Sequence, residues 1–155
     1  MRLCLTVLLS IAACVAPATA ASSHPEEGTW RLIPAKSKYQ YGPPPKSMTI
    51  QYLPATAGIH YNSRGVNADG QEFSSSFVAQ TDGREYPVTG SRKWAPVMLK
   101  RVDSRTLQAT YVRYGRTMAI SKSVLSQDGS TMTVTTRASN GRGSVYTNVS
   151  FYQKQ

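Results

Sequence analysis

The sequence predicts an all-β fold, an antiparallel up-and-down meander of about 8–10 strands that closes into a β-barrel. The first reason is a pattern from Met48 onward, in which runs of about six to nine residues rich in Thr, Val, Tyr and Phe alternate with turn dipeptides. The second is that no window of about eleven residues or more has the spacing of an amphipathic helix. Strands with one apolar face must either stack as two sheets or close into a barrel, because open strand edges promote aggregation, and the short turns favour the up-and-down barrel. A two-layer β-sandwich is the alternative.

The first twenty residues have the pattern of a secretory signal peptide. Arg2 gives a basic start, an apolar run extends from Leu3 to Val15, and Ala18-Thr19-Ala20 predicts cleavage after Ala20. The apolar run is shorter than the roughly 20 residues that cross a bilayer as a helix. A second interpretation takes SIAAC as a lipoprotein signal with Cys14 as the lipidated residue. Both interpretations predict an exported protein, secreted or periplasmic.

The mature chain is predicted to fold as one domain that is held together by its core alone. Both cysteines, Cys4 and Cys14, lie in the leader, so the mature chain has none with which to form a disulfide. About 135 residues suffice for this, because a domain of that length buries roughly two thirds of its unfolded surface. The whole chain has a net charge of +10, with basic residues spread along it. This indicates a solvated basic exterior, with a dedicated anion-binding face as the alternative.

The predicted elements follow in order from residue 21. Residues 21–27 are a polar, flexible spacer, and residues 28–155 form the barrel domain, whose first strand covers Gly28–Ile33. In residues 34–47, three consecutive prolines remove backbone donors and fix φ near −65°, which predicts extended polyproline-like chain and no helix. Further strands are predicted over residues 48–53, 58–63, 71–79, 84–88, 95–102, 106–114, 117–125, 131–138 and 144–154.

Each predicted strand has one apolar and one polar face, because successive side chains of a strand point to opposite sides. In the last strand, Val149 and Phe151 share the apolar face and Ser150 and Tyr152 share the other. The apolar faces are expected to turn inward. Asp-Gly and Asn-Gly supply the positive φ angles of primed hairpin turns. Such turns are expected at Asp69-Gly70, Asp82-Gly83, Asp128-Gly129 and Asn140-Gly141.

The two ends of the mature chain resemble the calycins, the superfamily of lipocalins and fatty-acid-binding proteins. Gly28-Thr29-Trp30 is similar to the Gly-x-Trp motif of the first calycin strand, and the ending NVSFYQKQ, with Tyr152, is similar to the last strand of fatty-acid-binding proteins. The resemblance implies a lipocalin-like barrel with a small molecule in its interior. In wider phrasing, GPPPKS and DGREYPVTG are similar to small exported bacterial proteins.

The chain also departs from these families. Where fatty-acid-binding proteins carry an Arg that grips the ligand carboxylate, this chain has Ser150, so the carboxylate clasp is not implied here. The two capping helices of that family are replaced by the proline-rich segment. This segment is expected either to lie over one mouth of the barrel, with Tyr39 and Tyr41 near the opening, or to cover a sheet edge as a strap.

The sequence predicts no enzyme, no cofactor and no metal site. The mature histidines are His24, in the spacer, and His60, on a strand, and no G-x-S-x-G elbow accompanies the many serines. The segment NADGQE lacks the spaced carboxylates of a calcium loop, so a turn explains it better.

The nine tyrosines carry the functional information. A tyrosine has a flat apolar body and a polar tip, which suits a partly wet cavity, although good β-propensity also explains tyrosines on strands. Arg113 shares a face with Tyr111: turned inward it is a buried cation that needs an anionic partner, and turned outward it belongs to an exposed basic, aromatic patch. The candidate ligand-binding residues are Tyr39, Tyr41, Tyr61, Tyr111 and Arg113.

The predicted function is that of an exported, non-catalytic, monomeric binding protein. It holds a small, mostly apolar molecule in a lipocalin-like barrel, and an anionic group on that molecule is one option. The alternative is a cell-envelope module whose basic surface docks on an anionic polymer or lipid surface. A nucleic-acid partner is not predicted, because no nucleic-acid-binding motif is present, and the mature chain has no transmembrane segment.

Overall fold

The computed structural model describes residues 24–91, 95–140 and 143–155, which form an antiparallel β structure with a single 3-10 turn at Pro34–Lys36. The predicted signal peptide, its cleavage site and Cys14 lie outside these residues. The strands are β1 (Gly28–Leu32), β2 (Lys38–Tyr39), β3 (Ser47–Ala55), β4 (Gly58–Val66), β5 (Glu72–Ala79), β6 (Asp82–Tyr86), β7 (Val97–Asp103), β8 (Thr106–Arg113), β9 (Arg116–Leu125), β10 (Thr131–Ser139) and β11 (Val145–Lys154).

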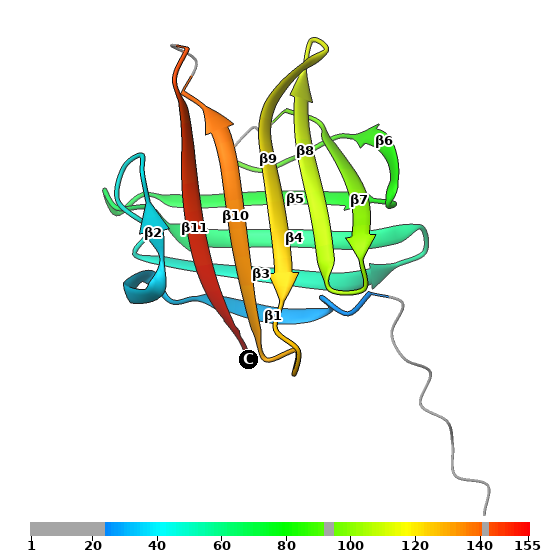
Figure 1. Cartoon of the computed structure of the whole chain (residues 1–155), viewed down its shortest axis with the longest axis horizontal. Helices are drawn as coiled ribbons and strands as arrows, with labels where there is room; N and C mark the ends of the chain where they lie inside the picture. The colour runs from blue at the N-terminus through cyan, green and yellow to red at the C-terminus, as the bar shows by residue number, and fades with distance from the viewer. Residues whose placement is uncertain (1–23, 92–94, 141–142) are drawn as a thin grey trace, which may run out of the picture.

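These strands form one sheet that curls around on itself. The hydrogen-bonded order is β5-β4-β3-β1-β11-β10-β9-β8-β7-β6, and β2 pairs with β11. The two ends of the chain meet where β1 pairs with β11, with Trp30 opposite Lys154 and Leu32 opposite Tyr152. Figure 1 shows β1, β3, β4 and β5 as a back layer that runs across the front strands β7 to β11. The predicted all-β meander closing into a barrel is confirmed, because one continuous sheet surrounds the interior.

The sheet is not hydrogen-bonded all the way round, because β5 and β6 are its two ends. Residues 89–91, which follow β6, cover part of this seam. Ser76 and Thr89 exchange two backbone hydrogen bonds of 2.9 and 2.8 Å, and the Ser91 hydroxyl accepts one of 2.8 Å from the Ser74 amide. The barrel is therefore nearly closed.

The most deeply buried side chains include Trp30 and several aliphatic residues of the surrounding strands. The indole Nε1–H of Trp30 donates to the Glu26 carbonyl at 2.8 Å, and the Lys154 ammonium lies 5.2 Å from the centre of the indole ring. The Gly-x-Trp start thus packs its Trp against the last strand and against the chain before β1. The other large, fully buried apolar side chains are Ile59, Val97, Leu99 and Met132.

The described part of the expected flexible spacer, residues 24–27, is packed against the barrel. Glu26 is only 1% exposed, and its carboxylate accepts two hydrogen bonds of 2.6 and 2.8 Å from the guanidinium of Arg101 on β7. A buried carboxylate is costly without such a partner. The sequence prediction missed this order because the two residues are far apart in the chain.

The turns correct the prediction of primed turns at the Asp-Gly pairs. Gly70 and Gly129 do have positive φ, but each donates its N–H to the residue three positions earlier, in a turn with one left-handed residue. Asp82-Gly83 lies within β6, at a register irregularity. The two-residue connection with two positive φ angles is instead Tyr114-Gly115, at 51° and 70°, which joins β8 to β9. Such a pair of angles is the mark of a type I′ turn. Gly141 lies outside the described residues.

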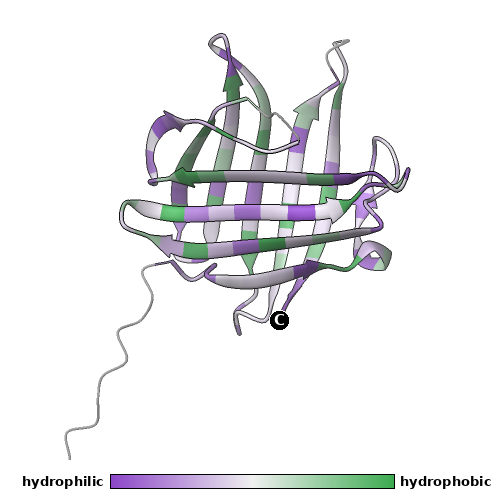
Figure 2. Cartoon of the chain, turned by 180° about the vertical axis from the view of Figure 1, so that it is seen from behind, coloured by the Kyte–Doolittle hydropathy of each residue, from purple (hydrophilic) through white to green (hydrophobic). Residues whose placement is uncertain are grey.

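The inward faces of two strands are the opposite of those expected. In β8 and β10 the apolar side chains, such as Leu107 and Met132, are buried as predicted. In β9 and β11 the polar face turns inward, and Val124 and Val145 are 44% and 55% exposed on the outside. Alternation shows which residues share a face, but hydroxyl side chains can line a cavity and β-branched residues suit an exposed strand. Figure 2 shows hydrophilic and hydrophobic residues interspersed along the strands rather than gathered in blocks.

Candidate functional site

The barrel encloses a cavity of about 380 Å³ between its two halves. Its size falls within the roughly 300–1,000 Å³ of small-molecule sites. The back half contributes Met48, Ile50, Tyr52, Tyr61, Ser63, Phe73, Ser75 and Phe77, and the front half contributes Leu99, Leu107, Ala109, Tyr111, Ser121, Ser123, Val134, Thr136, Tyr146, Asn148, Ser150 and Tyr152.

Aromatic rings dominate the wall formed by β3, β4 and β5, which we call the aromatic wall: Tyr52, Tyr61, Phe73 and Phe77. Tyr61 and Phe77 stack with ring centroids 4.6 Å apart and planes 9° apart. Tyr52 meets the edge of Tyr61 at 5.3 Å. Opposite positions on neighbouring strands bring these rings together, since Tyr61 is paired with both Tyr52 and Phe77. The wall offers a broad apolar face with the phenol oxygens as its polar points.

Hydroxyl groups mark the facing wall on β9, β10 and β11, which we call the hydroxyl wall: Ser121, Ser123, Thr136 and Ser150. The hydroxyls of Ser121 and Thr136 are 2.8 Å apart on neighbouring strands. The Ser123 side chain lies close enough to the Tyr52 hydroxyl to oppose, in part, the rise that burial causes in the Tyr52 pKa. Ser123 and Ser150 are both 8% exposed, so these are interior hydroxyls rather than surface ones.

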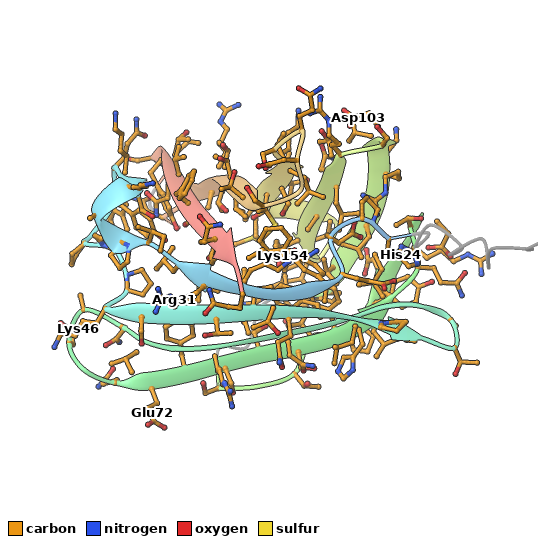
Figure 3. All side chains as sticks on the ribbon, turned by 90° about the horizontal axis from the view of Figure 1, so that it is seen from below. His24, Arg31, Lys46, Glu72, Asp103 and Lys154 are labelled. Atoms are coloured by element: carbon orange, nitrogen blue, oxygen red, sulfur yellow. The ribbon has the colours of Figure 1, made fainter. Side chains whose placement is uncertain are left out.

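The cavity contains no ionic group: among the described residues that line it, none is Asp, Glu, Lys, Arg or His. Figure 3 shows Lys46, Glu72 and Asp103 at the outer margin of the molecule. Burial raises the pKa of the Tyr52, Tyr111 and Tyr152 hydroxyls well above the ordinary tyrosine value, with neighbouring tyrosines adding to the effect. These tyrosines are therefore neutral at physiological pH.

The proline-rich segment combines features of both predicted arrangements. It lies at the mouth of the cavity, and it also pairs with a strand of the sheet. Contrary to the expected absence of a helix, it begins with the 3-10 turn, and β2 then pairs with β11. Asn148 Oδ1 accepts hydrogen bonds from the Gln40 and Tyr41 amides, at 2.9 and 3.3 Å. The Tyr41 ring stacks on Tyr146 at 4.9 Å. Tyr39, Tyr41, Pro43 and Pro45 all line the cavity. We call residues 38–46 the strap.

The structure brings four of the five candidate ligand-binding residues to this cavity. Tyr61 and Tyr111 lie within it, and the strap contributes Tyr39, whose hydroxyl is 2.6 Å from that of Ser150, and Tyr41, which is 59% exposed. Arg113 is not among the lining residues. It is exposed at the end of β8, so the outward of its two predicted positions is the one observed, beyond the part of β8 that borders the interior.

Sequence reasoning missed the hydroxyl wall. The signal was present, because Ser121 and Ser123 alternate with Ile120 and Lys122, and Asn148 and Ser150 alternate with Thr147, Val149 and Phe151. It was assigned to the exterior, since polar faces of strands usually meet water. Tyr152, chosen as a family signature, also lines the cavity, and its hydroxyl donates to the Met48 sulfur at 3.2 Å.

His60 and its polar neighbours form a separate cluster outside the cavity. His60 lies outside the cavity lining, where its Nε2 is 3.3 Å from the Ser76 hydroxyl, which in turn donates to Asn62. Within the part of the chain that the structure describes, no three His, Cys, Asp or Glu residues gather closely enough to hold a metal ion.

A membrane-spanning helix is likewise not found among the described residues: none of their helical segments has the length and hydropathy for it.

Comparisons with known proteins give a structural similarity alone. No protein-family model matches the sequence, and a comparison with curated proteins finds no match. Among solved structures, the zebrafish ileal bile acid-binding protein, complexed with cholic acid, is similar with a TM-score of 0.50. The two chains are 10% identical, and the match covers 84% of this chain and 99% of the zebrafish one. The similarity shows that the fold is a calycin-type barrel, as the Gly-x-Trp start predicts.

Proposed function

We propose that this protein is a non-catalytic binding protein that holds a small, largely apolar molecule inside its barrel. The observation that carries the proposal is the cavity of about 380 Å³, which combines stacked aromatic rings with a few interior hydroxyls. Ligand sites are typically concave and mostly apolar, with a small number of polar groups that fix orientation. The solved structure of similar fold is named for binding a bile acid, which supports the same use of the interior.

In this proposal the four tyrosines that the sequence predicted as ligand-binding residues, all of which line the cavity, have distinct roles. Tyr61 supports the apolar body of the ligand together with Phe77, and Tyr111 borders it from β8. Tyr39 and Tyr41 lie on the strap, where the ligand enters and leaves. Arg113 has no role in this binding, because it does not reach the cavity.

The proposed place of action is outside the cytoplasm. Support comes from the signal-peptide pattern of residues 1–20 with cleavage after Ala20, or from lipidation at Cys14 in the second interpretation. A cleaved or lipidated mature N-terminus is distinguished by intact-mass spectrometry of protein purified from an exporting host.

A pair of cavity variants tests the binding proposal. Ala109→Phe adds a ring inside the cavity, whereas Gln108→Phe adds the same ring one residue earlier on β8, outside the lining. We expect Ala109→Phe to abolish binding of a fluorescent, uncharged lipid analogue and Gln108→Phe to leave it unchanged. Native mass spectrometry and lipid extraction of the purified protein supply the natural ligand. Equal binding by both variants would show that the analogue sits elsewhere, and the proposal would fail.

A second candidate function is docking on an anionic surface, and one region favours it. Strands β9, β10 and β11 contain Arg116, Lys122, Arg137 and Lys154 and no acidic residue. At the tip of the β8–β9 hairpin, Tyr114 is 96% exposed beside Arg116. Binding to anionic vesicles should then fall steeply with added salt. Retention that is independent of salt rules this function out.

A further inference from the structure

We propose that the cavity selects an uncharged, facially amphipathic ligand, with an apolar ring face toward the aromatic wall and hydroxyl or carbonyl groups toward the hydroxyl wall. This inference rests on the proposed function and names its ligand class. The sequence left an anionic ligand open, whereas this inference excludes one. Its support is the absence of charged side chains from the described cavity lining, the hydrogen bonds of the hydroxyl wall and the positions of the two walls.

A carboxylate ligand buried in a protein needs a cation or several hydrogen-bond donors to replace its water. The cavity lining offers no cation. On β7 of the front half, the Arg101 side chain is 24% exposed, and its guanidinium donates two hydrogen bonds to the Glu26 carboxylate, at 2.6 and 2.8 Å. The pair cancels its own charge, so an anionic ligand finds no partner there.

The hydroxyls of Tyr52 and Tyr111 belong to the cavity lining, and burial favours their neutral form. The same desolvation acts on any anion placed beside them. A neutral hydroxyl or carbonyl loses much less on leaving water, provided that it finds a hydrogen-bond partner.

The hydroxyl wall can make hydrogen bonds to a ligand. A hydroxyl has one donor and two acceptor positions. When Ser121 and Thr136 bond to each other at 2.8 Å, one donor and several acceptor positions of the pair remain for a ligand. Such a pair can both donate and accept, which matches a ligand hydroxyl, and its single remaining donor also suffices for a neutral carbonyl. A carboxylate needs several donors to replace its water, and the pair does not supply them.

The aromatic wall and the hydroxyl wall lie on opposite halves of the barrel, because the back strands β3, β4 and β5 run across the front strands β9, β10 and β11 (Figure 1). The back strands also carry the Ser63 and Ser75 hydroxyls, and the front strands also carry apolar side chains such as Leu107 and Val134. A ligand between the halves therefore meets the stacked rings on one side and the Ser121–Thr136 pair on the other. The cavity of about 380 Å³ restricts it to a small ring compound or a short amphiphile.

Matched probes of one size test the inference. 2-Naphthol, naphthalene and 2-naphthoate share a ring system, and at pH 7 they present a neutral hydroxyl, no polar group and a negative charge, respectively. Titration calorimetry with the folded protein should give 2-naphthol an affinity at least about tenfold higher than that of 2-naphthoate, a difference of about 1.4 kcal/mol.

A double variant then tests the hydroxyl wall. Ser121→Ala with Thr136→Val should weaken 2-naphthol about tenfold and leave naphthalene unchanged, since the change removes hydrogen bonds while keeping the shape. Thr135→Val, on the outward neighbour of Thr136, is the matched control and should change neither probe. Circular dichroism confirms that each variant is folded.

The outcomes separate this inference from the proposed function. If 2-naphthoate binds as tightly as 2-naphthol, the cavity remains a binding site and the uncharged ligand class is wrong. If the double variant weakens naphthalene as much as 2-naphthol, the hydroxyl wall has no selective role and the inference also fails. If none of the three probes binds, the proposed function fails together with it.

Discussion

The ion pair between Glu26 and Arg101 joins the chain before β1 to β7, on the other half of the barrel. The Glu26 side chain is 2% exposed and that of Arg101 is 24% exposed, so the pair is buried mainly on the acidic side. Removing the cation leaves a desolvated carboxylate without its two hydrogen bonds, because His24 Nδ1, 3.9 Å from Glu26 Oε1, is too distant to replace them. Arg101→Met should therefore lower the free energy of unfolding by about 3 kcal/mol, measured by urea denaturation. Arg113→Met, at an exposed position, is the control and should change it by less than about 0.5 kcal/mol.

A double variant shows whether the stranded charge causes this loss. In Glu26→Gln with Arg101→Met, the buried position is neutral, so much of the lost stability should return. The Trp30 indole still has its bond to the Glu26 backbone carbonyl, which does not depend on the side chain. A double variant that is less stable than Arg101→Met would contradict this account.

Asp128 gives a pH-dependent contribution at the β9–β10 turn. Hydrogen bonds from the Ser126 hydroxyl, and then from the Ser130 amide and hydroxyl, lower its pKa to about 2. Because the folded pKa lies below the unfolded value of about 3.9, the contribution is fully present above that value and is lost as the pH falls through about 2. The stability advantage of the native chain over Asp128→Asn should be constant above about pH 5 and shrink between about pH 4 and pH 2. Thermal unfolding at a series of pH values measures it.

Removal of an exposed carboxylate elsewhere is the control for that series. Asp69→Asn changes a carboxylate in another Asp-Gly turn, between β4 and β5. A stability difference for Asp128→Asn that stays constant down to pH 2 would show that the turn hydrogen bonds do not favour the ionised form.

At the scale of the elements, strand positions were readable from the sequence and strand orientation was not. Glycines at turns and alternating side chains place β3 to β11 within a few residues of their observed bounds. The predicted inward face was wrong in β9 and β11. There Ser121 and Ser150 contact hydroxyls on other strands, and no local pattern in the sequence reveals such partners. Glu26 was misjudged for the same reason, since its partner Arg101 is distant in sequence.

The strap is held to the barrel mainly through Asn148. Its side-chain oxygen accepts from the Gln40 and Tyr41 amides, and the Gln40 side chain in turn accepts from the Thr147 amide at 2.7 Å. Asn148→Ala should release the strap, so that the Gln40 and Tyr41 amides exchange hydrogen at least about tenfold faster. Ligand dissociation, followed by stopped-flow fluorescence, should also become faster. Ser139→Ala, on the outer face of β10, is the comparison. Unchanged exchange at both amides would mean that pairing of β2 with β11 alone holds the strap.

At the scale of the whole molecule, the curled sheet has an interior lined by neutral side chains, and the charged side chains lie outside that lining. The chain has a net charge of +10, yet the buried Glu26 carboxylate is paired with Arg101, and neither residue is among those that line the cavity. Composition predicted the positive exterior. It could not predict a neutral interior, because that depends on which side of the curled sheet each strand turns.

The seam between β5 and β6 is where the barrel as a whole can be opened. Gly90 lies in the segment that covers it, at φ +116°, and a Cβ atom there would collide with the Ser74 carbonyl oxygen. Gly90→Ala should detach residues 89–91 from β5, lower the unfolding free energy by more than the about 1 kcal/mol expected for a positive φ alone, and speed exchange of the Ser76 amide. Gly42→Ala is the matched control, because Gly42 also has positive φ, at +71°, but has no atom within 4 Å of the added Cβ. Hydrogen exchange and urea denaturation of the two variants measure the difference. If both variants lose the same stability and the Ser76 amide stays protected, residues 89–91 do not close the barrel.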